Sequence, residues 1–355
     1  MNTNLLPALS IEYLKSYLSI NSMIGCSVNC AYCFLAPIEI VPMHPIRVIG
    51  EKELVSTLLN HPLFVNGKTI LSLNNRTDPF ISNQVKESTF RVLEELEAAN
   101  VKSVVTMTTK GLLTDFDVRR LESLNLKLVI IVTYNEIPMN IQPIPSYIQV
   151  STMQNVASSK HLKLLHQFRP IIPQINDSAE TIENVLSVAH QYCAASIYQG
   201  VRISEQINNR LRERGYIFYG AYDKHKQKSP EVDRIMQNYS RSKFSDYPIF
   251  DHTSCCLSYL LQLPDYNLHY KKRNCPNSCK NYERCHTAHI KIPDKKDIET
   301  DIKRLGISCK WEFCDNSLQI RGILNDEQRS YFRHTYGLNV TSTVRSPSFS
   351  EQFID

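Results

Sequence analysis

The sequence lacks any long hydrophobic run. Among its 355 residues, the longest wholly apolar stretch is the short one around residues 128–132, whereas a membrane-spanning helix needs about 20 such residues. It also opens without a basic and then apolar leader. We therefore expect no membrane anchor and a cytoplasmic protein. The formal charge of +5 is modest for this length, so it permits an acidic or nucleic-acid partner without requiring one.

Cysteine, by contrast, is abundant, with eleven residues. In a short secreted protein this number would suggest disulfides, but this chain is long and its cysteines cluster at metal-ligand spacings. A reducing compartment is the expected setting.

The first cluster lies in the stretch GCSVNCAYCFL, where Cys26, Cys30 and Cys33 have C-x3-C-x2-C spacing and Tyr32 precedes the last cysteine. A four-iron, four-sulfur cluster usually takes four thiolates, so a loop that offers three leaves one iron open to another ligand. Zinc also accepts thiolates, although its usual paired C-x2-C arrangement is absent from this loop. Three packed cysteines are the remaining interpretation.

This loop resembles the signature of the radical S-adenosylmethionine (radical SAM) superfamily. The resemblance implies that Cys26, Cys30 and Cys33 hold a 4Fe-4S cluster whose open iron chelates S-adenosylmethionine. Reductive cleavage of that cofactor would give a 5′-deoxyadenosyl radical, which abstracts a hydrogen atom from the substrate. The resemblance also implies an electron donor such as flavodoxin or ferredoxin.

Downstream of the loop, short apolar runs alternate with segments of helical spacing. Strands are expected at 18–24, 69–73, 101–107, 126–133, 168–175 and 195–203, and helices at 51–59, 82–99, 112–124 and 179–192. This alternation predicts an α/β fold, a partial (β/α)6 TIM-type barrel followed by a smaller cysteine-rich C-terminal α+β domain. The expected boundaries are 1–221 for the barrel, 222–248 for a polar linker and helix, and 249–355 for the C-terminal domain.

Polar residues follow the expected strands, and in parallel α/β folds ligands bind at the carboxyl ends of the strands. Each residue taken singly could also be an ordinary turn or helix cap. The segment NRTDP, within Asn74 to Pro79, resembles the branch of radical SAM proteins that contains spore photoproduct lyase and related DNA-repair enzymes. The GGE segment common elsewhere in the superfamily is absent.

That resemblance implies a set of cofactor contacts. Asn74 or Thr77 would meet the methionine amino group of S-adenosylmethionine and Lys110 its carboxylate. Thr133 and Asn135 would lie near the ribose, and the backbone of Gly200 and Val201 near the adenine. Tyr32 of the loop completes the expected cofactor-binding set: Tyr32, Asn74, Thr77, Lys110, Thr133, Asn135, Gly200 and Val201.

A second cluster contains Cys255, Cys256, Cys275, Cys279 and Cys285. The last three, with one member of the adjacent pair, supply four thiolates for an auxiliary 4Fe-4S cluster or a structural zinc. The sequence leaves open which of Cys255 and Cys256 is the ligand, and we name Cys256 as the candidate. Cys255 is then a candidate catalytic residue, since spore photoproduct lyase uses a thiol to return a hydrogen atom to the product radical. The alternative is that the spare cysteine only packs.

The sequence thus predicts an enzyme that abstracts a hydrogen atom from a peptide or small-molecule substrate. Repair or modification of a nucleic-acid base is the alternative, although we find no recognised nucleic-acid motif. A non-catalytic zinc-binding adaptor, in which both cysteine groups join domains, is the hypothesis from another class of protein.

Overall fold

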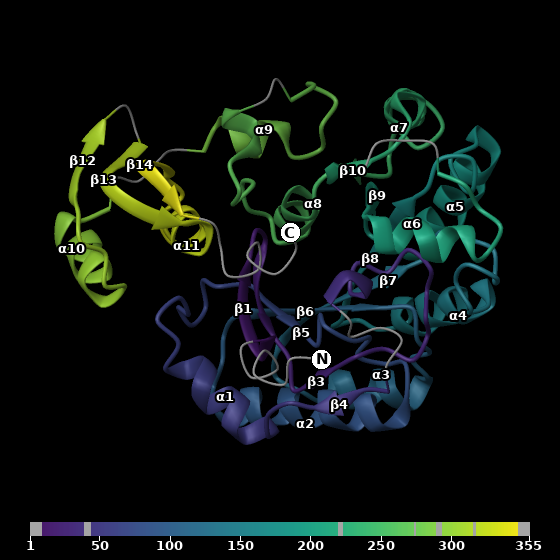
Figure 1. Ribbon diagram of the computed structural model, residues 1–355, viewed down its shortest axis with the longest axis horizontal. Helices are drawn as coiled ribbons and strands as arrows, with labels where there is room; N and C mark the ends of the chain where they lie inside the picture. Colours follow the sequence, from purple (N-terminus) through teal and green to yellow (C-terminus); the bar gives the residue numbers. More distant parts are fainter. Residues whose placement is uncertain are drawn as a thin grey trace.

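The computed structural model describes residues 9–38, 44–218, 223–272, 275–288, 293–314 and 317–346. Its large sheet contains six parallel strands in the order β2-β5-β6-β7-β8-β9 (Figure 1). Their bounds are β2 Tyr17–Ile20, β5 Leu71–Leu73, β6 Val104–Thr109, β7 Lys127–Thr133, β8 Lys163–Ile171 and β9 Ser196–Ile203. The expected parallel sheet of six strands is confirmed.

Additional strands cover both ends of this series. β1 (Ile11–Leu14) pairs antiparallel with β2, and β10 (Asp223–Gln227) pairs antiparallel with β9. β11 (Ile249–Phe250) adds a short parallel pairing to β9. Within the described part of the chain, β1 and β10 do not pair with each other, so the barrel is partial.

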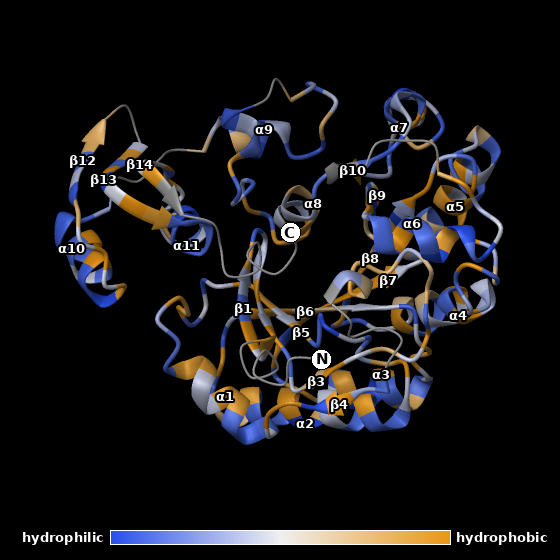
Figure 2. Ribbon diagram, in the orientation of Figure 1, coloured by the Kyte–Doolittle hydropathy of each residue, from blue (hydrophilic) through white to orange (hydrophobic). Residues whose placement is uncertain are grey.

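Six helices alternate with the strands along the chain. They are α1 Glu51–Leu59, α2 Asn83–Ala98, α3 Asp115–Glu122, α4 Ser146–Ala157, α5 Ala179–Tyr192 and α6 Glu205–Arg212. Side chains of Ser82, Thr114 and Ser178 accept hydrogen bonds from backbone N–H groups in the first turns of α2, α3 and α5. Figure 2 shows that hydrophobic and hydrophilic residues alternate along the outer helices α1 and α2, as expected for helices with one face on a sheet.

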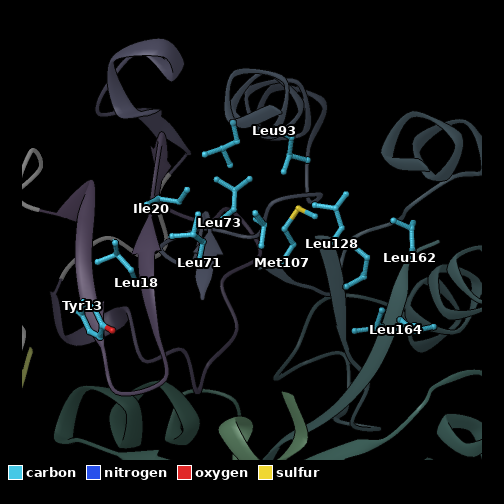
Figure 3. Packing of buried hydrophobic residues seen from close by; sticks show 14 of the residues in the cluster. Tyr13, Leu18, Ile20, Leu71, Leu73, Leu93, Met107, Leu128, Leu162 and Leu164 are labelled. Atoms are coloured by element: carbon cyan, nitrogen blue, oxygen red, sulfur yellow. The ribbon is translucent and has the colours of Figure 1, made fainter. Parts of the chain in front are cut away.

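Alternate residues of the strands enter two different cores. Leu128, Ile130 and Val132 of β7 belong to the large core, which α1, α2, α4 and α5 also enter. In Figure 3, Leu18, Leu71, Leu73 and Met107 from neighbouring strands lie in one layer beside Leu93 of α2. The intervening residues Val129 and Ile131 instead pack against Phe250 and against Leu257 of α8 (Thr253–Leu260). Helix α8 therefore covers the inner face of the sheet.

Some expected bounds were wrong. The first strand does not run from 18 to 24, because the Asn21 side chain bonds to the carbonyl of Leu9 and the N–H of Arg76 and so ends β2. Met23–Ile24 forms a separate strand, β3, which pairs with β4 (Ile46–Arg47). The fifth strand is Lys163–Ile171 rather than 168–175. Helix α4 was not anticipated, because its buried face includes Gln149 and Thr152 and so conceals the apolar period.

The C-terminal part contains a smaller three-stranded sheet of β12 (Lys310–Cys314), β13 (Ser317–Asn325) and β14 (Asn339–Ser346). The remaining helices are α7 Pro230–Arg241, α9 Tyr282–His286, α10 Lys295–Arg304 and α11 Asp326–Tyr336. The proposed boundary at residues 221 and 222 lies outside the described residues, and the expected linker contains β10 and α7. In the portion of the chain that can be assessed, no helix is long and apolar enough to cross a membrane.

We predict that Gly111→Ala destabilises the fold, because a Cβ at this position would lie 2.4 Å from the carbonyl oxygen of Phe80. Gly111 also accepts a hydrogen bond from Thr152 Oγ1 (2.9 Å), so its backbone cannot move away freely. We expect the free energy of unfolding to fall by about 1–3 kcal/mol, measured by urea unfolding. Gly50→Ala is the control, since the nearest atom to its new Cβ is 3.9 Å away; equal losses in both variants would contradict the prediction.

Candidate functional site

The cysteine loop follows β3 and is held by three parts of the barrel. Gly25 N–H donates to the carbonyl of Arg76 after β5 (3.0 Å), and Ala31 N–H donates to that of Ile141 after β7 (2.9 Å). From α6, Arg210 donates to Asn29 Oδ1 (2.6 Å) and to the carbonyl of Cys30 (2.9 Å). The loop therefore lies at the carboxyl end of the parallel strands, where ligands bind in such folds.

The loop thiols are poor acids when no metal is bound. Burial, together with the nearby Asp78 carboxylate, raises the pKa of Cys26 to about 12. Burial also raises the pKa of Cys30 and Cys33, while the positive charges of Lys110 and Arg210 act in the opposite direction. Thiolate is the form that ligates metal, so a bound cation would offset the burial of three negative charges here.

The three loop thiols are not gathered as closely as the ligands of a single zinc ion would be. Thiolates around one tetrahedral zinc lie about 3.8 Å apart, given Zn–S bonds of about 2.3 Å. The three loop thiols do not form a set whose sulfur atoms all lie within 4.8 Å of one another. A 4Fe-4S cluster distributes its thiolates over different irons, and this donor set is suited to it.

Asp78 joins the loop after β5 to the end of β6. Its Oδ1 accepts hydrogen bonds from Thr109 Oγ1 (2.6 Å) and Phe80 N–H (3.1 Å), and its Oδ2 accepts from Lys110 N–H (2.7 Å). Lys110 Nζ then lies 5.8 Å from the centre of the Tyr32 ring. Lys110, the residue predicted to meet the carboxylate of S-adenosylmethionine, thus lies beside the cysteine loop.

The two residues predicted for the amino group of the cofactor differ in environment. Asn74 is fully buried: its Oδ1 accepts from Ser22 N–H (3.1 Å), and its Nδ2 donates to Thr89 Oγ1 (2.8 Å). Its side chain therefore holds the fold together, and the structure does not favour Asn74 as a cofactor ligand. Thr77 Oγ1 is buried and has no hydrogen-bond partner in the described structure, as a group that awaits a ligand would.

Tyr32, Asn135 and Gln142 form one buried network. Tyr32 OH donates to Gln142 Oε1, and Gln142 Nε2 donates to Asn135 Oδ1 (3.1 Å). Asn135 Nδ2 donates to the carbonyl of Arg169 (3.0 Å). Thr133 Oγ1 donates to Gln167 Oε1 (3.2 Å) and is also buried. These contacts connect the ends of β7 and β8 to the loop, so Tyr32 and Asn135 position the site.

Gly200 and Val201 lie together in β9. A Cβ on Gly200 would approach the carbonyl oxygen of Gln227 in β10 to 1.9 Å, which explains the glycine. Val201 packs in an apolar cluster with Cys30 and Tyr32. The same cluster includes Ile172 and Leu211, which line a cavity of about 530 Å³. This volume suits a small ligand.

Arg169 was missed by the sequence reasoning. It follows Leu165 and Gln167 on the inner face of β8, and its titratable neighbours are Tyr17, Arg202 and Tyr32. Burial lowers its pKa, and it forms no ion pair with an acidic residue in the described ranges. A lone arginine in an otherwise largely apolar strand was the available signal. Its position on β8, near Tyr17 of β2, places a cation inside the barrel.

The two cysteines of the adjacent pair have different surroundings. Cys255, Cys275, Cys279 and Cys285 line one pocket, together with Asp265. Cys256 is fully buried in the apolar cluster on the inner face of the sheet, does not line that pocket, and has Cys193 as its titratable neighbour. The structure therefore brings Cys255, not Cys256, to the other three thiols. Cys255 is accordingly a candidate ligand rather than a hydrogen-atom donor.

Comparison with solved structures identifies the fold. A spore photoproduct lyase double mutant with bound AdoMet and dinucleoside spore photoproduct matches with a TM-score of 0.54 and 13% identity, covering 69% of this chain and 79% of that one. A single mutant of the same enzyme gives a TM-score of 0.53 at 14% identity, with the same coverage. SuiB from Streptococcus suis, bound to S-adenosylmethionine, gives a TM-score of 0.44 at 12% identity, covering 68% of this chain and 50% of that one.

No family model matches the sequence, and no curated protein matches it. The chain has the fold of a radical SAM enzyme, as its cysteine loop led us to expect. More particularly, the fold is that of spore photoproduct lyase.

We predict that Asn74→Ala and Thr77→Val differ in their effects on stability. Asn74→Ala leaves the Ser22 N–H without its acceptor and removes the donor to the Thr89 hydroxyl, so the free energy of unfolding should fall by about 1–3 kcal/mol. Thr77→Val removes a buried hydroxyl that has no partner, so stability should be unchanged or higher. Chemical unfolding of the metal-free protein checks both; a large loss in Thr77→Val would contradict the assignment.

Proposed function

We propose that this protein is a radical SAM enzyme that abstracts a hydrogen atom from a peptide or small-molecule substrate. The observation that carries the proposal is the three-thiol loop at the carboxyl end of a six-stranded partial barrel with the spore photoproduct lyase fold. Cys26, Cys30 and Cys33 would hold a 4Fe-4S cluster, which would supply the electron for reductive cleavage of S-adenosylmethionine. A reducing compartment and a flavodoxin or ferredoxin donor belong to the same proposal.

Thr77 and Lys110 are the residues that would orient the cofactor. The unpartnered Thr77 hydroxyl can accept a hydrogen bond from an amino group, and the Lys110 ammonium can pair with a carboxylate. Both follow strands that Asp78 ties together, so their separation is fixed before the ligand arrives. Such preorganisation lowers the cost of binding.

The enclosed inner face of the barrel protects a reactive intermediate from solvent. Helix α8 packs in one apolar cluster with Val129, Ile131, Leu165 and Ile197, and so covers this part of the inner face of the sheet. Exclusion of water and bulk solutes prevents side reactions of the intermediate. The cavity beside Ile172 and Leu211, of about 530 Å³, has room for a small molecule or a peptide side chain, although the loop cysteines do not line it.

A nucleic-acid base is the second candidate substrate. Its support is the fold likeness to spore photoproduct lyase, which is bound to a dinucleoside spore photoproduct in the matched structure. The chain has a net charge of +5, and Arg169 places a cation inside the barrel. A mobility shift with DNA or RNA that weakens as salt is raised would support this candidate. If DNA and RNA bind only below about 50 mM salt, the peptide or small-molecule substrate is favoured.

We predict that the anaerobically reconstituted and reduced protein releases 5′-deoxyadenosine from S-adenosylmethionine. The Cys26→Ala, Cys30→Ala, Cys33→Ala triple variant should release none above background, because its cluster is not held. Liquid chromatography of the products is the measurement. Cys309→Ala, which alters a cysteine outside both clusters, should retain the wild-type yield. Equal yields from the triple variant and wild type would refute the proposal.

We predict that Lys110→Gln and Thr77→Val weaken S-adenosylmethionine binding. Loss of a charged hydrogen bond of about 1.5–3 kcal/mol corresponds to a rise in Kd of about 10-fold or more for Lys110→Gln; a smaller rise is expected for Thr77→Val. Equilibrium dialysis with the reconstituted protein gives the Kd. The exposed Lys102 offers the matched control Lys102→Gln, and an unchanged Kd in Lys110→Gln would remove Lys110 from the site.

A further inference from the structure

Four thiols converge beside α8 and α9, at a place separate from the cysteine loop. Cys255 comes from α8, Cys275 and Cys279 from the segment before α9, and Cys285 from α9 itself. They line one pocket although up to 30 positions separate them in the chain. Cys193, Cys256, Cys309 and Cys314 take no part in its lining. Such convergence of thiols from three segments is typical of a metal centre.

We propose that Cys255, Cys275, Cys279 and Cys285 hold a second 4Fe-4S cluster, with every iron ligated by the protein. The site depends on its own thiols and stands independently of the function proposed for the barrel. Because four cysteines complete the ligation, no iron is left for a substrate. The centre would therefore exchange electrons rather than bind a substrate.

The spacing of the thiols favours a cluster over zinc. Four thiolates on one zinc would lie about 3.8 Å apart, yet no three of these sulfur atoms lie within 4.8 Å of one another. A single ion would thus require the surrounding segments to move inward. A four-iron cluster would instead be held by the four thiolates, one on each iron.

One compact trio near the site offers a rival arrangement. The ligand atoms of Cys255, Asp265 and His269 all lie within 4.8 Å, the only such group among the residues that can be described. However, Asp265 Oδ2 already accepts hydrogen bonds from His269 Nδ1 (2.9 Å) and His269 N–H (2.6 Å). The His269 ring also stacks on that of His252, with centroids 3.9 Å apart. We therefore assign Asp265 and His269 to support of the site.

Hydrogen-bond donors around Cys285 indicate that it is a thiolate ligand. Asp265 N–H donates to Cys285 Sγ (3.3 Å), and Asn281 Nδ2 donates to the same sulfur (3.5 Å). Asn281 is held in turn by the carbonyl of Leu263 (3.1 Å). Donors to a ligand sulfur stabilise its negative charge and, in iron-sulfur proteins, tune the reduction potential. A cysteine that only packs would not need two such donors.

The experiment uses the full chain with Cys26→Ala, Cys30→Ala and Cys33→Ala, which remove the thiols of the loop. Any iron that this triple variant binds must then be held outside the loop, whether or not the loop itself binds a cluster. After anaerobic reconstitution, we expect about four irons and four sulfides per chain and, on reduction with dithionite, an electron paramagnetic resonance signal. Adding Cys255→Ala should reduce the iron to below about one per chain. Adding Cys256→Ala or Cys309→Ala should leave it near four.

A conservative variant separates ligand loss from misfolding. Cys255→Ser keeps an oxygen ligand, so it should retain part of the iron with an altered resonance signal, whereas Cys256→Ser should leave the signal unchanged. One zinc and no iron in the triple variant would overturn the proposal, as would equal iron loss from Cys255→Ala and Cys256→Ala. Circular dichroism of the metal-free proteins shows whether each variant folds.

Discussion

The buried carboxylate of Asp78 is the contact on which the upper part of the barrel depends. It accepts from Thr109, Phe80 and Lys110, and so fixes the loop after β5 against the end of β6. Two residues earlier, Arg76 pairs with Glu12 of β1 through two bonds of 2.7 and 2.5 Å, and its carbonyl holds Gly25 at the start of the cysteine loop. One short segment thereby sets the positions of the thiols, Thr77 and Lys110 together.

The sequence predicted the elements of the barrel better than the roles of its polar residues. The strand at Lys127–Thr133 and the helices at Glu51–Leu59 and Ala179–Tyr192 have clear periods, because one face of each helix, and both faces of the strand, enter a core. A polar residue at a strand end gives no such signal. Asn74 and Thr77 are both polar residues after the same strand. The side chain of Asn74 is fully hydrogen-bonded, whereas the side-chain hydroxyl of Thr77 has no partner in the described structure. Tertiary contacts alone distinguish them.

The choice between Cys255 and Cys256 has the same origin. Adjacent residues of an α-helix point about 100° apart. The side chains of Cys255 and Cys256 on α8 therefore point in different directions. Sequence spacing does not reveal the rotation of α8. In the folded chain Cys256 has Cys193 as its titratable neighbour, whereas Cys255 lines a pocket with Cys279 and Cys285. The same helix therefore closes the barrel and supplies a ligand to the second site.

Charge is distributed differently around the two cysteine groups. Lys110 and Arg210 lower the pKa of Cys30 and Cys33 against the effect of burial, whereas Asp78 raises the pKa of Cys26 and Cys30. Two cations and one carboxylate therefore surround the loop thiols. Around Cys255, the charged neighbours Asp265 and Asp251 instead raise the thiol pKa further, and His269 is already paired with Asp265. The cations beside the loop would offset part of the charge of bound thiolates. Around the second group, where carboxylates raise the thiol pKa, the two N–H donors to Cys285 would stabilise thiolate charge instead.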